Sequence, residues 1–319
     1  MGFRLVPRQD SDFDRLYLLG KAAAPLEWDY DRAFERCCHE QSLRFDTHAG
    51  WVIEDAAGNA VGSATACIGP EKPNDASVDI TIHPGCVHEA RDQAAEAYHK
   101  AMDWARERGA ERFSGWTSDR TLWRLEFWLE RGYRRGCIES CSVLDLTTWD
   151  PERFREKTLR AHEAGVELIT MADPGAPARE DIPALINRAE QSMPSATEWT
   201  DSADERVLHR LFEGPYYDPR LFHWAKIDGQ WAGLSLLTQW SPDSAIQDDT
   251  AVFEEFRRRG IAWALKIRLT SAAKQAGLKR LVTWNEVGNQ GMLAVNRQMG
   301  YEHRLHTVQM LLGHDEPTE

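Results

Sequence analysis

The sequence predicts an α/β protein with two similar domains, and three observations support this. The chain has 319 residues, more than one typical domain. It contains an internal repeat in which equivalent residues lie 168 positions apart, namely Gly109 and Gly277, Trp116 and Trp284, Gly132 and Gly300, and Tyr133 and Tyr301. Each half also shows the same order: a helical start, a hairpin, a strand into a long helix, another strand, another helix and a Gly-Tyr strand. That order is typical of a sheet covered by helices.

The domain boundary is expected where the first copy of the repeat ends. Asp150 can cap a helix and Pro151 suits its first turn, so a short helix is predicted over 151–163. The predicted organisation is a first domain over 1–146, a connecting segment over 147–164, a second domain over 165–314 and a frayed tail over 315–319.

Composition narrows the class of protein. A net charge of −13 argues against nucleic-acid binding and favours cationic partners such as amines. No apolar run reaches the ~20 residues of a membrane span, and the N-terminus lacks the apolar core of a signal peptide. A cytoplasmic protein without membrane contact is therefore expected. The six cysteines show no paired spacing, so no metal site is predicted.

The most informative segment joins a strand to a helix in the second half. Thr250–Phe253 is β-prone, and apolar residues recur at helical spacing from Trp263 until Gly277. Between them lies Arg257-Arg258-Arg259-Gly260-Ile261-Ala262. Such a turn directs free backbone N–H groups and a positive helix end at one point, while the arginines add positive charge. The segment therefore predicts an anion site for a phosphate or pyrophosphate.

Two common nucleotide motifs are absent, because the chain has neither Gly-x-x-x-x-Gly-Lys-Ser/Thr nor Gly-x-Gly-x-x-Gly after a strand. Instead, Arg-x-x-Gly-x-Ala resembles the acyl-CoA pyrophosphate loop of the GNAT acetyltransferase superfamily. The following strand Arg280–Trp284, three asparagines and Gly300-Tyr301 resemble the closing segment of that family. The resemblance covers roughly 165–312. It implies tandem GNAT-like domains, each a mixed, mostly antiparallel twisted sheet flanked by helices, in an arrangement similar to that of mycothiol synthases.

The resemblance also implies how acetyl-CoA is held as co-substrate, without a metal. The predicted cofactor-binding residues are Arg257, Arg258, Arg259, Gly260, Ile261 and Ala262 at the pyrophosphate, Thr250, Val252 and Phe253 along the pantetheine arm, and Asn285 and Asn289 beside it. Capping or turn formation is the alternative role for these asparagines.

Attack by an amine requires a base that removes a proton from its ammonium form. Asp249 and Glu255 are the preferred candidates, although each could simply balance neighbouring arginines. Asn296 stands where many members of the family carry a tyrosine that protonates the departing thiolate. It can donate a hydrogen bond to the sulfur but cannot deliver a proton.

The first half differs from the second at the loop. An offset of 168 places Glu89 at Arg257 and Asp92 at Gly260, so carboxylates stand where a pyrophosphate site needs positive charge and close backbone approach. We therefore expect a degenerate first domain and a catalytic second domain. The predicted activity is direct transfer of an acetyl group to the amine of a small molecule, by a monomer or homodimer. The alternative is a non-catalytic acyl-CoA sensor or scaffold.

Overall fold

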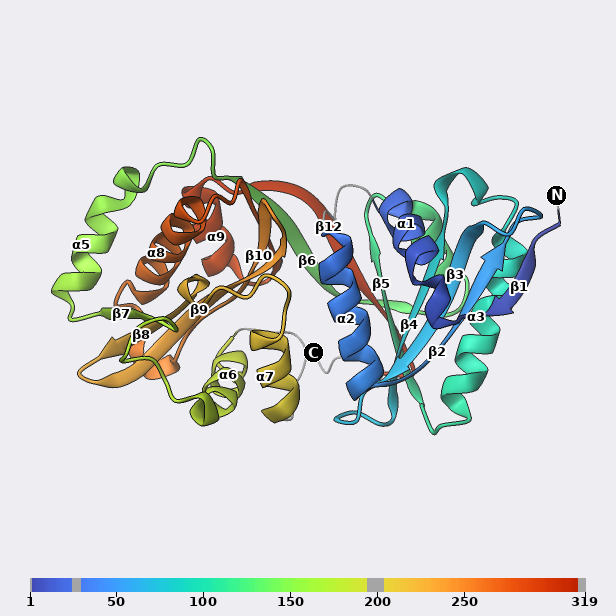
Figure 1. The fold of residues 1–319 in the computed structure, drawn as a ribbon, viewed down its shortest axis with the longest axis horizontal. Coiled ribbons are helices and arrows are strands. Elements are labelled where there is room, and N and C mark those ends of the chain that lie inside the picture. The colour runs from blue at the N-terminus through green and yellow to red at the C-terminus, as the bar shows by residue number, and fades with distance from the viewer. Residues whose placement is uncertain (1, 25–29, 194–203, 315–319) are drawn as a thin grey trace. The chain divides into compact units, whose positions relative to one another are not determined.

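The computed structural model describes residues 2–24, 30–193 and 204–314, and the predicted tail over 315–319 lies outside this range. The chain divides into two compact units (Figure 1). Unit 1 comprises Met1–Ile138 and Leu305–Glu319, and unit 2 comprises Glu139–Arg304. The predicted boundaries at 146 and 165 differ from this division. Two strands cause the difference, since β6 (Arg134–Asp145) and β12 (Glu302–Leu312) each contribute residues to both units.

Unit 1 is a sheet with helices on its faces. Its other strands are β1 (Arg4–Pro7), β2 (Thr47–Glu54), β3 (Ala60–Ile68), β4 (Asp75–Ile82) and β5 (Arg112–Ser118). Its helices are α1 (Phe13–Ala23), α2 (Arg32–Phe45), α3 (Arg91–Arg106) and α4 (Leu122–Leu129). The strands pair in the order β1-β2-β3-β4-β5-β12. Only β4 and β5 are parallel neighbours in this order, because α3 connects them as a crossover.

Unit 2 repeats this plan. Its other strands are β7 (Glu167–Thr170), β8 (Phe222–Ile227), β9 (Gln230–Ser241), β10 (Ser244–Val252) and β11 (Arg280–Glu286). Its helices are α5 (Arg155–Glu163), α6 (Ile182–Gln191), α7 (Asp204–Phe212), α8 (Ile261–Gln275) and α9 (Gln290–Met299). The order is β6-β11-β10-β9-β8-β7, with β10 and β11 parallel. Figure 1 shows α8 and α9 on one side of this sheet and α6 and α7 on the other.

These observations confirm the predicted fold class, two tandem units with mixed, mostly antiparallel sheets. The repeated glycines lie at equivalent turns. Gly109 and Gly277 have φ of 88° and 90°, and Gly132 and Gly300 have φ of 81° and 99°. Glycine is favoured at each of these positions because a side chain disfavours positive φ. The sequence periodicity thus reports the positions at which helices end.

The predicted helix after Asp150 is present, but it belongs to unit 2. The Asp150 carboxylate accepts a hydrogen bond from the Glu152 amide at 3.0 Å, and a short 3-10 turn over Pro151–Phe154 leads into α5. Trp149 and Phe154 are buried in the same hydrophobic cluster as residues of α8. The segment is therefore packed against the second unit.

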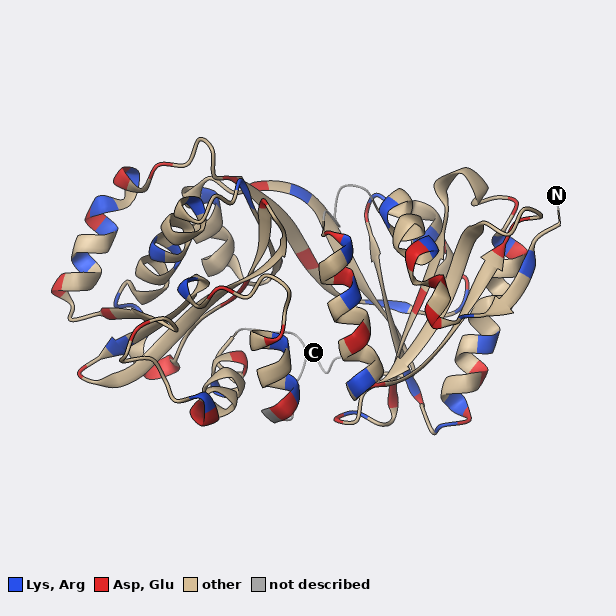
Figure 2. Ribbon diagram, in the orientation of Figure 1, with Lys and Arg blue, Asp and Glu red and all other residues tan. Residues whose placement is uncertain are grey.

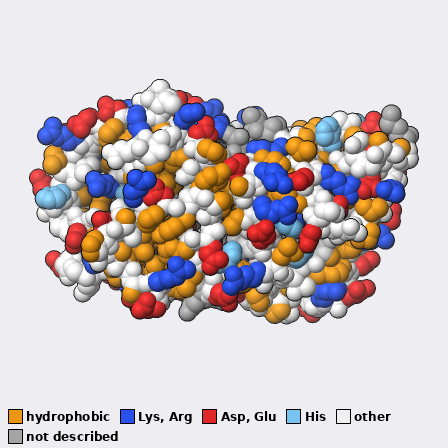
Figure 3. Space-filling view, in the orientation of Figure 1, with side chains coloured by type: hydrophobic (Ala, Val, Ile, Leu, Met, Phe, Trp, Pro, Cys, Tyr) orange, Lys and Arg blue, Asp and Glu red, His pale blue; other side chains and the backbone are white. Residues whose placement is uncertain are grey.

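Charge is mixed along the helices. Figure 2 shows both signs on α2 and α5, and the face visible in Figure 3 intersperses acidic and basic side chains. On that face, the net charge of −13 is not gathered into one acidic patch. Within the described residues, no helix is both long and apolar enough to cross a membrane.

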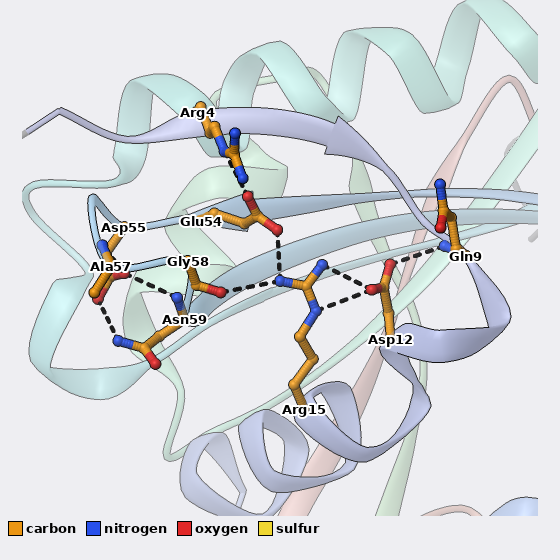
Figure 4. A network of polar contacts seen from close by, with 9 residues as sticks. All are labelled: Arg4, Gln9, Asp12, Arg15, Glu54, Asp55, Ala57, Gly58 and Asn59. Carbon is orange, nitrogen blue, oxygen red and sulfur yellow. Dashed lines mark hydrogen bonds and ion pairs between the residues drawn. The ribbon is translucent and has the colours of Figure 1, made fainter.

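A buried ion network ties the start of the chain to the hairpin between β2 and β3 (Figure 4). Arg15 of α1 donates to Asp12 at 2.7 Å, to Glu54 at 2.5 Å and to the carbonyl oxygen of Gly58 at 3.1 Å. Arg4 of β1 donates to the other oxygen of Glu54 at 2.6 Å. The side chains of Asp12 and Glu54 are only 9% and 6% exposed, so their charges depend on these guanidinium groups.

Replacing Arg15 by alanine should destabilise unit 1 strongly. The change leaves two carboxylates nearly buried without their main partner, which typically costs about 3–5 kcal/mol in the free energy of unfolding. Chemical denaturation of Arg15→Ala measures this loss. Arg32→Ala is the matched control, because Arg32 pairs with Asp14 at an exposed site and its loss should have a much smaller effect. Equal effects of the two substitutions would contradict a structural role for the network.

Candidate active site

The loop between β10 and α8 has a backbone shape suited to binding an anion. A short 3-10 turn over Glu254–Phe256 follows β10, and Gly260 caps α8 with φ of 78°. Arg258 also has a positive φ, 65°, which is uncommon for a residue with a side chain. Among the described residues, the amides from Arg258 to Trp263 donate to no backbone carbonyl outside regular elements. The loop and the first turn of α8 therefore present free N–H groups, as a phosphate site requires.

The three arginines of the loop do not play the same part. Arg258 and Arg259 form no ion pair within the described part of the chain, so their charge is available to an anion. Arg257 donates instead to the carbonyl oxygen of Ser192, at the end of α6, and to that of Val252 at 3.4 Å. In this structure Arg257 braces the loop against α6. Its predicted contact with a pyrophosphate remains a prediction.

Towards the end of β10 that leads into the loop, β10 and β11 diverge. They pair in parallel only from Ser244 to Ile246, opposite Arg280 to Val282. At the next position the Thr283 hydroxyl donates to the carbonyl oxygen of Gln247 at 3.1 Å. Thr250, Ala251 and Val252 pair with β9 on the other side and, within the described residues, do not pair with β11. The edge of β10 that contains the predicted residues Thr250 and Val252 is thus left open for an extended ligand arm.

The predicted asparagines have different surroundings. The Asn296 amide, 2% exposed, donates to the Asn285 side-chain oxygen at 2.6 Å, and no described group donates to the Asn296 oxygen. Asn285 lies near the end of β11, so this pair stands beside the diverging strands. Asn289 instead caps α9 by accepting from the Met292 amide at 3.1 Å. Phe253 is fully buried and its amide donates to the Ala232 carbonyl oxygen at 3.0 Å, so its contact with a ligand arm remains a prediction.

Asp249 lies in a β-bulge close to further charged groups. The register between β10 and β9 shifts between Gln247 and Thr250, which places Asp248 and Asp249 in the bulge. Burial, together with the charges of Asp248 and Glu190, raises the pKa of Asp249 to about 7, although Arg210 acts to lower it. A carboxylate with a pKa near neutrality can accept a proton and release it again at physiological pH. The surroundings of Asp249 therefore suit a general base.

Glu255 is in a different state. It forms an ion pair with Arg188, and about half of its side chain is exposed. A hydrogen bond from its own backbone amide holds its pKa below the usual value, and Arg188 lowers it further. A weakly basic, already paired carboxylate is the poorer candidate for the base.

Sequence reasoning missed the partners of Asp249. Glu190 of α6 is 7% exposed and accepts from Arg210 of α7 at 3.0 Å. An acidic residue on the buried face of a helix with an arginine 20 residues later was the available signal, but sequence spacing does not show that both approach β10. Among the described residues, no cluster of three or more His, Cys, Asp or Glu residues could hold a metal ion.

The equivalent region of unit 1 contains a large aromatic side chain. Its strands β4 and β5 also pair in parallel over three residues, ending at Ser77 and Ser114. Just beyond, the Trp128 indole lies so close to Gly115 that a Cβ there would be 2.8 Å from the ring and 2.9 Å from the carbonyl oxygen of Val78. The offset of 168 places Trp128 at Asn296. A fully buried indole in unit 1 thus takes the position that Asn296 holds in unit 2.

The loops that precede α3 and α8 correspond at an offset of 170 residues, two more than the offset of 168 that the sequence suggested. The helix caps are Ala90 in unit 1 and Gly260 in unit 2, so the pairing of Gly260 with Asp92 was wrong. The shift arises because α3 begins earlier relative to the glycine that ends it. Unit 1 still has no glycine at the cap, and the Ala90 amide donates to the Cys86 carbonyl at 2.9 Å.

Comparison with known proteins identifies the fold. Residues 184–301 match the model described as the Acetyltransferase (GNAT) family, which confirms the resemblance seen in the sequence. This part of the chain, which lies within unit 2, is therefore similar to the acetyltransferases that the model describes. No curated protein matched the chain.

Solved structures match the whole chain. A GCN5-related N-acetyltransferase from Sphaerobacter thermophilus has a TM-score of 0.73 at 16% identity, over 97% of this chain and 95% of that one. A tandem GNAT protein from the clavulanic acid biosynthesis pathway has a TM-score of 0.69 at 21% identity, over 99% and 100%. At these identities the likeness concerns the fold. The fold of these proteins is therefore shared by the whole chain.

Proposed function

We propose that unit 2 transfers an acetyl group from acetyl-CoA to the primary amine of a small molecule. The observation that carries this proposal is the set of free amides from Arg258 to Trp263, next to strands that diverge. In this proposal the amides, the α8 N-terminus and the charges of Arg258 and Arg259 bind the pyrophosphate. The pantetheine arm follows the open edge of β10 towards Asn285 and Asn296.

The proposed reaction is a direct transfer in a ternary complex. Asp249 removes a proton from the ammonium group, either directly or through water, and the free amine attacks the thioester carbonyl carbon. A C–N bond forms, the attached nitrogen gives up one further proton to water, the C–S bond breaks, and its electron pair leaves with the CoA sulfur. With a pKa near ~8.5, a thiolate can leave without full protonation. The amide of Asn296 can support it with a hydrogen bond, and water can supply the final proton.

A non-catalytic acyl-CoA-binding role is the second candidate. One observation favours it, since Asn296 donates its amide to Asn285 and is nearly buried, so no acid stands at that position. Both roles need the same loop. They differ only in whether an amine causes turnover.

CoA release in the presence of a panel of primary amines tests the proposal. The purified chain is mixed with acetyl-CoA, and free thiol is followed with and without each amine. We expect release that depends on one class of amine, without an initial burst when the amine is omitted, because no acetyl-enzyme forms. An amine-independent burst would contradict direct transfer. Tight acetyl-CoA binding without turnover on any amine would favour the non-catalytic role.

A further inference from the structure

Unit 2 contains a buried polar network that the proposed reaction does not use directly. The Lys266 ammonium of α8 donates to the Gln247 side-chain oxygen at 2.7 Å, and the Tyr301 hydroxyl donates to the same oxygen at 2.5 Å. Lys266 is 1% exposed and Gln247 is 1% exposed. The Gln247 amide nitrogen has no partner among the described residues, and no carboxylate contacts Lys266 there. Burying a lysine in this way is costly, so the network calls for a functional explanation.

The network is centred on the residue at which the bulge of β10 begins. Gln247 pairs with Leu237, and the next regular pair is Thr250 with Ser235. Its carbonyl oxygen also accepts from Thr283 of β11, where the parallel pairing has ended. Gln247 is therefore held from three directions: by α8, by the Tyr301 hydroxyl and by β11. Asp248 and Asp249 follow it immediately in the chain.

Unit 1 provides an internal comparison. Counting from the last parallel pair, Val78 of β4 occupies the position that Gln247 has in β10. The antiparallel pairing of β3 and β4 contains no bulge, since it runs without a shift from Gly62 opposite Ile82 to Cys67 opposite Ser77. The offset of 168 places Tyr98 at Lys266 and Tyr133 at Tyr301. The two tyrosine hydroxyls lie 3.5 Å apart, so unit 1 has a tyrosine where unit 2 has the buried lysine. The unit without a bulge thus lacks the network, and the unit with a bulge has it.

We propose that Lys266, Gln247 and Tyr301 form a positioning network that fixes the β10 bulge and so holds Asp249 in the orientation needed to meet the acceptor amine. This rests on the proposed function of unit 2. The geometry explains why Gln247 is polar although it is buried, since its side chain accepts from α8 and from Tyr301 while its backbone starts the bulge. The charged groups that act on Asp249 are Asp248 on β10, Glu190 on α6 and Arg210 on α7. None of them belongs to the network.

The test replaces the two central polar groups together, because removing Gln247 alone leaves a buried ammonium without an acceptor. In Lys266→Met with Gln247→Leu, we expect amide hydrogen exchange at 248–250 to accelerate about tenfold or more. We expect kcat/KM for the amine to fall about 10- to 100-fold, with the acid limb of its pH profile moved to lower pH. The affinity for acetyl-CoA should fall much less than kcat/KM does, since the amides from Arg258 to Trp263 lie outside the network.

Two further variants complete the design. Gln247→Glu alone, with Lys266 in place, should keep exchange at 248–250 slow and retain most of the activity, because a carboxylate offers Lys266 an acceptor. Tyr98→Phe with Tyr133→Phe is the matched control in unit 1, and it should leave all three readouts unchanged. Where the double variant fails to fold, Tyr301→Phe is used, with the same expectations at smaller magnitude.

Hydrogen exchange separates this proposal from the proposed function. Unchanged exchange at 248–250 in a folded double variant would overturn the positioning role, whatever the activity. Faster exchange would support it even if the wild-type protein acetylates no amine in the panel. A fall in acetyl-CoA affinity as large as the fall in kcat/KM would also overturn it, because the network would then act on the cofactor site.

Discussion

Asp249→Asn is expected to lower kcat/KM for the amine by about 10²–10⁴-fold while leaving acetyl-CoA binding nearly unchanged, because it removes only the group that accepts the proton. In the wild-type protein, kcat/KM should rise with pH through about 7, the pKa to which burial and Asp248 raise Asp249. The variant should lose this limb. Initial rates of both proteins, measured from pH 5 to 9, show whether this limb is present in the wild-type protein and absent in the variant.

The titration of Asp249 should also affect the free energy of unfolding, which should fall with rising pH over the range in which activity rises. The folded state keeps the Asp249 proton to a higher pH than the unfolded chain does. Its contribution to the free energy of unfolding is therefore fully present at low pH and is lost as pH rises through about 7. Asp249→Asn should remove this dependence.

Glu255→Gln is the matched control for the base. Its carboxylate is already paired with Arg188, so the substitution should change kcat/KM less than about threefold. A larger loss from Glu255→Gln than from Asp249→Asn would reverse the assignment of the base.

Gly260→Asp should weaken acetyl-CoA binding by about 100-fold or more. The substitution puts a carboxylate at the α8 cap, beside the amides that we propose bind the pyrophosphate, and like charges there repel. Space is not the obstacle, since a Cβ at this position would meet only Ala161, at 3.9 Å. Isothermal titration of the variant measures the loss.

Gly260→Asn separates charge from backbone conformation. Asparagine has nearly the same shape as aspartate and tolerates the positive φ of 78° that this cap requires. We therefore expect a much smaller loss of affinity than with Gly260→Asp. Equal losses would mean that conformation, and not charge, sets the affinity.

The sequence was most informative where local backbone chemistry determines structure. Gly260 at a positive φ, Asn289 as a cap and Asp150 as a cap follow from residue type and position. The repeated glycines likewise predicted where α3 and α8 end. These features depend on neighbouring residues, which a sequence displays directly.

Features that depend on distant partners could not be predicted in this way. Nothing in the β6 or β12 sequence shows that each strand joins both units, because a strand carries no local record of its neighbours. The orientation of Arg257 towards Ser192 depends on where α6 ends in space. The pKa of Asp249 depends on Glu190 and Arg210, which are remote in the chain.

The two units also show why an offset alone misleads. Because α3 begins earlier than α8 relative to the glycine at its end, the preceding loops correspond at an offset two residues larger than the one between these glycines. The stronger reason to expect one cofactor site is Trp128, whose indole packs against Gly115 of β5 at the position that Asn296 holds in unit 2. Only the packed structure reveals that steric fact.

The central claim is that one unit of two binds acetyl-CoA, and calorimetric titration of the full-length protein tests it most directly. We predict one site per chain, with heat that disappears in Gly260→Asp and persists in Trp128→Phe, a conservative change in unit 1. Two sites per chain would contradict the claim, as would a single site that survives Gly260→Asp.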